Sequence, residues 1–333
     1  MTLRVNALTI TTEPSHEPST RPSNEPITNP SRELHSESLW ITLDNGLDRL
    51  HLKRFYQCSD GIPVFLLHGS VSSGRIFYSN SMKGLAPFLA RHGFDVYVAD
   101  LSGRGQSTPR VTRHSKRNQQ HIVTEEIPAF LQKIRELRGQ NTTIHAVAHS
   151  WGGVLLAAYL ARFPAARFGS MVFLGSKRHV SVLNRQRVFG IDLLWGLVGG
   201  LSTRVYGYLP AKQLRLGSDD EPAAVYRDCK RWVYRKRQWR DQKYDFDYLA
   251  ALKQAKNLPA TLHLAGQNDT FLGHPTDVQQ LMHDMHNPLD QFMLLSTANG
   301  FQQNYDHLSM CIAASAEEDH FGLIRDWIQS HAD

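Results

Sequence analysis

The sequence has little cysteine and lacks a long apolar run. Three cysteines, Cys58, Cys229 and Cys311, are scattered through 333 residues. Their odd number and wide spacing argue against a disulfide framework and predict a reducing, cytoplasmic environment. No stretch of about 18 apolar residues is present, so no membrane span is expected. The best candidate, residues 188–201, is too short and contains Asp192.

The first 38 residues are poor in apolar side chains and rich in Pro, Ser, Thr and Glu. They cannot bury enough surface to fold, so we expect residues 1–38 to form a disordered tail. They also lack the apolar core of a signal peptide. The tail holds more acidic than basic residues, whereas the whole chain has a net charge of +6. Residues 39–333 therefore carry a larger net positive charge than the chain as a whole.

Residues 39–56 are expected to form two strands joined by a turn at Asn45-Gly46. The chain after them alternates between strand-like and helix-like segments. This alternation predicts an α/β fold with a doubly wound, mostly parallel sheet. The rhythm is interrupted at residues 177–257, which we expect to form a mainly helical cap inserted into a core of residues 39–176 and 258–333. The expected strands are 62–70, 94–100, 142–148, 168–176, 259–269 and 291–297, and the expected helices are 82–93, 125–139, 151–163, 275–287 and 317–330.

One serine, Ser150, lies at the junction of an expected strand and helix in "HAVAHSWGG". A serine on so tight a turn has strained backbone angles and a side chain pushed outward. Small residues, Ala148 and Gly152, lie two positions before and after it, where strand and helix backbones must approach closely. A serine that only caps the helix is the alternative. The stretch "AHSWG" resembles the nucleophile elbow of the α/β-hydrolases, G-x-S-x-G, with Ala148 in place of the first glycine.

This resemblance implies a catalytic triad in the chain order Ser, acid, His. Asp269 in "LAGQND" follows an expected strand and resembles the family's acid, although Asn-Asp could simply form a polar turn. His307 in "NYDHLS" follows the last strand and resembles the catalytic histidine. Asp306 is a rival acid, and His320 is a rival base that we expect on a solvated helix face.

Acyl transfer also requires hydrogen-bond donors for the oxyanion that develops during the reaction. The resemblance implies that the backbone N–H of Trp151 is one donor and that of Ser70, after "LLHG", is the other. Val71 is a neighbouring alternative. We interpret His68 as structural. The turn "DLSGRGQS" (100–107) lacks the third glycine of a dinucleotide site, so nucleotide binding is rejected and Asp100, Gly103, Arg104 and Gly105 are expected to be scaffold.

The expected cap contains two unusual segments. Residues 188–201 could line an acyl pocket or form a lid, or they could simply pack on the core. Residues 226–248 interleave Arg and Lys with aromatic residues. That pattern suits nucleic acid, an anionic membrane or acidic substrates, but an amphipathic helix with a solvated basic face is the simpler interpretation. We expect no nucleic-acid binding. His283 and His286 lie beside Asp284 without a second ligand pair, so no metal or other cofactor is expected.

Together these patterns identify the chain as an α/β-hydrolase-like serine hydrolase. The expected substrate is a small molecule carrying an acyl group, and the cap's loose resemblance to lipases makes a carboxylic ester, including a lipid-like one, the first expectation. Thioester, amide or C–C bond hydrolysis would suit the same triad. The alternatives from other classes are a non-catalytic binding protein on this fold and a peripheral membrane protein anchored by the basic cap.

Overall fold

The computed structural model describes residues 33–332 apart from 236, 237 and 242. Most of the expected tail, residues 1–32, lies outside the described residues. The end of that tail does not match the expectation, because residues 35–38 belong to strand β1 (His35–Thr42). They pair antiparallel with β2 (Arg49–Tyr56), in a register that places Ser38 opposite Lys53. Backbone pairing therefore orders a segment whose composition alone predicts disorder.

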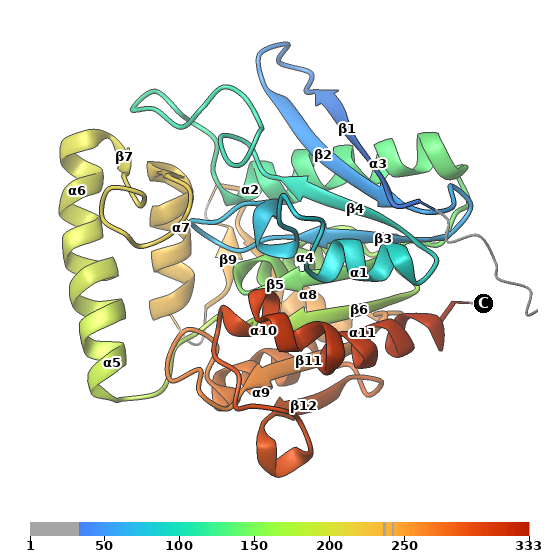
Figure 1. The fold of residues 1–333 in the computed structure, drawn as a ribbon. Coiled ribbons are helices and arrows are strands. Elements are labelled where there is room, and N and C mark those ends of the chain that lie inside the picture. Colours follow the sequence, from blue (N-terminus) through green and yellow to red (C-terminus); the bar gives the residue numbers. More distant parts are fainter. Residues whose placement is uncertain (1–32, 236–237, 242, 333) are drawn as a thin grey trace, which may run out of the picture. The chain divides into compact units, whose positions relative to one another are not determined.

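A large mixed sheet organises the described chain (Figure 1). Its strand order is β1-β2-β4-β3-β5-β6-β11-β12. Strands β1 and β2 pair antiparallel with each other, β2 pairs antiparallel with β4, and the remaining neighbours are parallel. The mostly parallel sheet predicted from the sequence is thereby confirmed. The other strands of the sheet are β3 (Ile62–Leu67), β4 (Phe94–Asp100), β5 (His145–His149), β6 (Ser170–Leu174), β11 (Ala260–Gly266) and β12 (Gln291–Leu295).

Helices cover both faces of the sheet, so its central strands are apolar on both sides. In β3, for example, Phe65 and Leu67 belong to one hydrophobic cluster, whereas Val64 and Leu66 belong to the other. The first cluster includes side chains of α3 (Ile127–Arg138), α4 (Trp151–Arg162), α8 (Tyr248–Gln254) and α9 (Pro275–Met285), and the second includes α1 (Leu85–Arg91), α10 (Ser309–Ile312) and α11 (His320–Gln329). Short helical turns are η1 (Gly74–Phe77), α2 (Gln119–His121), η2 (Ile122–Glu126), η4 (Thr297–Asn299) and η5 (Ala314–Glu318).

The segment between β6 and β11 is mainly helical, and its residues 185–234 lie to the left of the sheet in Figure 1. Its last helix, α8, packs against α4 of the sheet layer, and Leu252 is part of the core there. The elements that precede α8 are α5 (Arg185–Arg187), η3 (Val188–Val198), α6 (Gly199–Tyr206), β7 (Tyr208–Leu209), β8 (Glu221–Pro222), α7 (Ala223–Tyr234), β9 (Arg240–Asp241) and β10 (Phe246–Asp247).

Elements α5, η3 and α6 form one helix from Arg185 to Tyr206, longer than the apolar run 188–201 that the sequence singles out. Within the described chain it is one helix whose length and composition would allow it to cross a membrane. That criterion alone is weak evidence, because core helices and signal sequences also meet it. Only 22% of the most apolar 18-residue stretch of this helix is buried in the protein. The helix is therefore not a core helix.

Candidate active site

Ser150 occupies a sharp turn between strand β5 and helix α4. Its φ angle of 54° lies in the left-handed region that residues other than glycine rarely adopt. The turn brings backbones together: a Cβ atom on Gly152 would lie 2.4 Å from the carbonyl oxygen of Leu67. A Cβ on Gly69 would lie 2.9 Å from the Cβ of Ser150. The small residue predicted at position 152 is therefore required by a close backbone approach.

The structure brings together the three side chains that the sequence singles out from distant segments. His307 lies after β12, and its Nε2 is 2.8 Å from the Oγ of Ser150. Its Nδ1 is 2.6 Å from the Oδ2 of Asp269, which follows β11. If Nδ1 donates its proton to the carboxylate, Nε2 is left free to accept the serine proton. The arrangement can therefore draw a proton from a serine that lies at the ends of the parallel strands.

Electrostatics hold Asp269 in its ionised form. Burial acts to raise the pKa of this carboxyl, but attraction to His307 and hydrogen bonds from His307 and the Gly273 backbone outweigh it, so the pKa lies below its usual value. The neighbouring His149 is neutral, because burial and the nearby His307 lower its pKa to about 3. His149 Nε2 donates to the backbone oxygen of His307, 2.8 Å away, and so supports the histidine loop. Sequence reasoning does not single out His149, although it precedes the serine directly.

The two N–H groups predicted to face an oxyanion lie close to Ser150. Trp151 is the first residue of α4, where helix amides have no partner within the helix. Gly69, in tight contact with Ser150, places the adjacent Ser70 near the same turn. Among the described residues, neither the Trp151 nor the Ser70 N–H has a hydrogen-bond acceptor. The alternative, the Val71 N–H, is already engaged, because it donates to Glu221 over 2.7 Å.

A family model described as the alpha/beta hydrolase fold matches residues 62–217, which include the serine turn. The sheet order and the position of the serine agree with that match. The chain has the α/β-hydrolase fold. Solved α/β-hydrolase structures superpose over most of its length, among them a thermophilic esterase from Thermogutta terrifontis. That structure has a TM-score of 0.57 and 17% sequence identity, and the match covers 89% of this chain and all of the esterase.

Two further proteins are similar to this chain. An esterase from Exiguobacterium antarcticum has a TM-score of 0.58 and 14% identity, and the match covers 88% of this chain and 100% of the esterase. A protein of Arabidopsis thaliana named triacylglycerol lipase 1 is 24% identical over an alignment of 314 residues, and the match covers 78% of this chain and 77% of that protein. The likeness to the two esterase structures shows that this chain shares their fold.

The protein carries a buried ion pair behind its candidate oxyanion loop. Glu221, in β8, pairs with Arg104, and both side chains are only 1% exposed. Besides accepting from the Val71 N–H, Glu221 accepts from the Ser70 Oγ over 3.3 Å. Arg104 thus has the scaffold position that the sequence predicts, whereas Glu221 is a residue that sequence reasoning missed. No local pattern indicates it, because its partners lie more than 100 residues away in the chain.

We expect the substitution Glu221→Gln to lower the free energy of unfolding by about 3 kcal/mol, because it leaves the buried guanidinium of Arg104 without its counter-charge. It should also reduce hydrolytic activity by loosening the loop that holds the Ser70 N–H. The matched control is Glu37→Gln, which removes a partly exposed partner of Arg54 and should cost about 1 kcal/mol or less. Urea unfolding of both variants measures the difference, and equal losses would contradict the structural role given to Glu221.

The rival residues, His320 and Asp306, take no part in the hydrogen bonds that join Ser150, His307 and Asp269. His320 is buried, and its Nε2 lies 2.7 Å from the backbone oxygen of Met310, so the expectation of a solvated helix face is wrong for it. Asp306 accepts hydrogen bonds from the N–H groups of Leu308 and Ser309 at the start of α10. Neither rival contacts Ser150 among the interactions of the described residues. Asp269 and His307 are therefore the partners that the geometry selects.

Proposed function

We propose that the protein is a serine hydrolase that cleaves carboxylic esters through an acyl-enzyme intermediate. The observation that carries this proposal is the hydrogen-bonded chain from Ser150 through His307 to Asp269, on a strained turn of an α/β-hydrolase fold. A serine hydroxyl is a poor nucleophile near neutral pH unless a base removes its proton as it attacks. His307 supplies that base within hydrogen-bond reach, and Asp269 orients it.

In the proposed reaction, Ser150 Oγ attacks the ester carbonyl while His307 Nε2 takes its proton. The negative charge that develops on the carbonyl oxygen is stabilised by the N–H groups of Ser70 and Trp151. His307 then protonates the leaving alcohol, and the acyl group stays on Ser150. A water molecule, deprotonated by His307, releases the acid and restores the serine.

An ester is preferred over other acyl substrates because proteins similar to this chain are named as a lipase and as esterases. Thioesters, amides and C–C bonds next to a carbonyl could be cleaved by the same groups. A non-catalytic binding protein is disfavoured, since it would have no use for a strained serine paired with a histidine and a buried carboxylate.

A fluorophosphonate probe tests the proposal directly, because it reacts with an activated serine and leaves a covalent adduct. We expect a single adduct, located on Ser150 by peptide mass spectrometry. A series of p-nitrophenyl esters of increasing chain length then measures the acyl preference, with p-nitrophenyl thioester and anilide analogues alongside. Labelling at another residue would contradict the nucleophile, and faster cleavage of thioesters would replace the ester as substrate class.

A further inference from the structure

The long helix between β6 and β11 exposes a stripe of large apolar side chains. Their spacing of four residues places them along one side of the helix, and they are between 41% and 70% exposed. Contiguous exposed apolar surface of this kind marks an interaction site in soluble proteins. The apolar stripe consists of Phe189, Leu193, Leu197, Leu201 and Val205.

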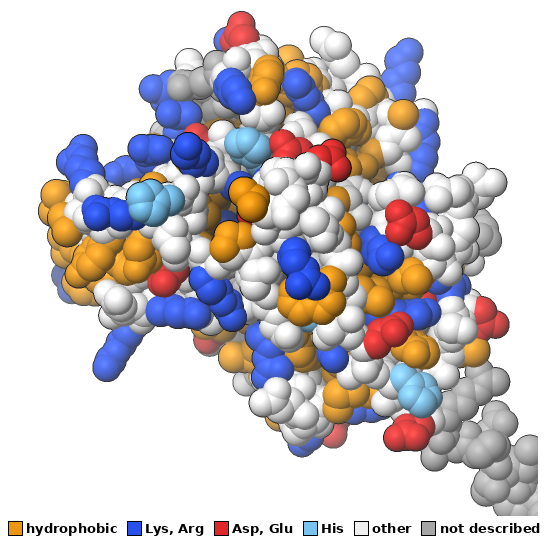
Figure 2. Space-filling view, turned by 90° about the horizontal axis from the view of Figure 1, so that it is seen from above, with side chains coloured by type: hydrophobic (Ala, Val, Ile, Leu, Met, Phe, Trp, Pro, Cys, Tyr) orange, Lys and Arg blue, Asp and Glu red, His pale blue; other side chains and the backbone are white. Residues whose placement is uncertain are grey.

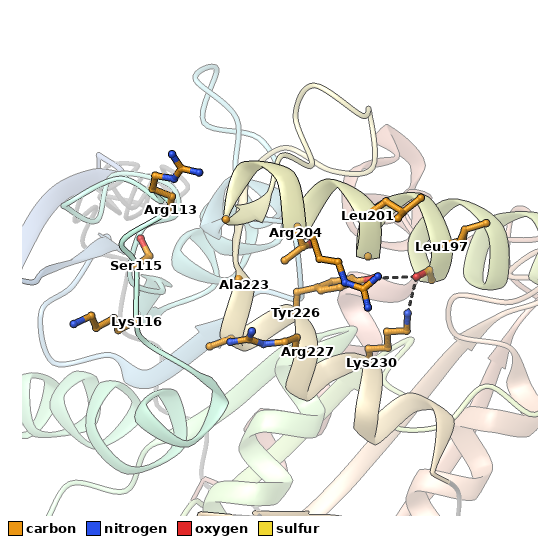
Figure 3. Close-up of a pocket in the computed structure, with 15 residues that line it drawn as sticks. Arg113, Ser115, Lys116, Leu197, Leu201, Arg204, Ala223, Tyr226, Arg227 and Lys230 are labelled. Carbon is orange, nitrogen blue, oxygen red and sulfur yellow. Dashed lines mark hydrogen bonds between the residues drawn. The ribbon is translucent and has the colours of Figure 1, made fainter.

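A basic pocket of about 890 Å³ lies beside this stripe, between the helix, α7 and the loop that precedes α2. Figure 3 shows basic side chains from all three segments around it, and Leu197 and Leu201 of the apolar stripe line it too. The stripe and the pocket are therefore one continuous surface. The cations of the basic pocket are Arg113, Lys116, Arg204, Arg227 and Lys230.

The basic pocket has an uncompensated positive charge. No Asp or Glu lines it, and none of its five cations has a carboxylate of a described residue within ion-pair distance. Lys230 Nζ donates to the backbone oxygen of Gly196 over 2.6 Å, a contact that leaves its charge unneutralised. Five like charges around one cavity repel each other and favour a bound anion.

The chemistry of the two features together points to an anionic lipid surface. A free anion would engage the cations but give no role to the aliphatic stripe, and single-stranded nucleic acid binds through stacked aromatic rings, which the stripe lacks apart from Phe189. At the left of Figure 2, hydrophobic side chains lie among Lys and Arg side chains on this part of the surface. An apolar strip with flanking cations is the pattern of helices that lie in a bilayer interface.

We propose that the apolar stripe and the basic pocket together bind the surface of an anionic phospholipid bilayer, with the helix lying parallel to it. The opposite side of the helix is held by the protein, which argues against a spanning arrangement. Tyr226 Oη donates to the backbone oxygen of Trp195 over 2.6 Å, and Tyr234 Oη donates to Asp192 over 3.0 Å. A helix that crossed the bilayer would have to break these contacts. This binding is independent of the proposed ester hydrolysis.

Co-sedimentation of the full chain with vesicles tests the proposal. We expect binding to vesicles of phosphatidylcholine with phosphatidylglycerol at 0.1 M NaCl, and on the order of tenfold weaker binding either at 0.5 M NaCl or to phosphatidylcholine alone. The double variant Arg204→Glu/Arg227→Glu should lose binding at least tenfold. The matched α8 control, Lys253→Glu/Lys256→Glu, changes the net charge equally at the end of α8 and just after it, outside the pocket. It should bind nearly as the unchanged protein does.

The apolar stripe is tested by Leu197→Gln/Leu201→Gln, which should weaken vesicle binding while leaving hydrolysis of a soluble p-nitrophenyl ester unchanged. Four results would overturn the proposal. They are equal binding to neutral vesicles, an equal loss in the α8 control, release of the protein from vesicles by millimolar inorganic phosphate, and resistance to extraction by high salt. The phosphate result would assign the basic pocket to a free anion, and the extraction result would assign the helix to a spanning role.

Discussion

Replacing Ser150 with alanine is expected to lower kcat for ester hydrolysis on the order of 10⁴-fold or more. The variant lacks the only atom that can form the acyl-enzyme in the proposed reaction, while the N–H groups of Ser70 and Trp151 remain to give weak residual rate enhancement. Initial rates with a short p-nitrophenyl ester measure the loss, and fluorophosphonate labelling should disappear with it.

The control for this variant is Ser81→Ala, which removes an exposed hydroxyl distant in sequence from Ser150. It should leave the rate of ester hydrolysis unchanged. Alanine at position 150 retains the backbone, so a thermal melt should show a folded protein, even a slightly more stable one. Hydrolysis that survives in Ser150→Ala would refute the serine mechanism, whatever the fate of vesicle binding.

The second large effect is expected for Asp269→Asn, which should reduce kcat by roughly 10³- to 10⁴-fold. The amide can donate to His307 Nδ1, and so it favours the tautomer that carries its proton on Nε2, where it cannot accept from serine. The amide also no longer stabilises the imidazolium formed during attack. The pKa of Asp269 is held below its usual value, so the carboxylate is ionised at neutral pH and the substitution removes a full charge.

Asp306→Asn is the matched control, because this acid adjoins His307 in sequence but hydrogen-bonds to the start of α10 instead. We expect it to change kcat less than about tenfold and to lower stability only slightly. The two variants should therefore separate by at least two orders of magnitude in kcat at neutral pH. If Asp306→Asn were the slower variant, the acid assigned by chain order would be the wrong one.

Sequence reasoning predicts much of the sheet and of the candidate site, because both depend on local patterns. Apolar runs bounded by turns indicate the strands, and parallel strands bring the residues after them to one edge. Ser150, Asp269 and His307 each follow such a strand, and the resemblance to the α/β-hydrolases implies that these three residues meet. The close approach at Gly152 is likewise visible as a small residue beside the serine.

The features that sequence reasoning misses depend on contacts between distant segments. Residues 35–38 look like part of a polar tail, yet they gain order by pairing with β2. His320 fits a solvated helix face, but packing against Tyr305 and Phe321 buries it. Glu221 has no local signal, since its role comes from Arg104 and Val71. Tertiary packing decides the environment of such residues, and a short window of sequence does not contain it.

The ion pair of Glu221 with Arg104 also limits how the entrance to Ser150 can open. Glu221 of strand β8 hydrogen-bonds to the loop that carries Ser70 and pairs with Arg104. If the whole segment between β6 and β11 moved away as one rigid body, the buried guanidinium of Arg104 would lose its counter-charge. Separating β8 from that loop is therefore costly, whereas the helix Arg185–Tyr206 is joined to α7 by hydrogen bonds from Tyr226, Lys230 and Tyr234. Any opening of this segment is therefore expected to leave β8 in place beside the loop that carries Ser70.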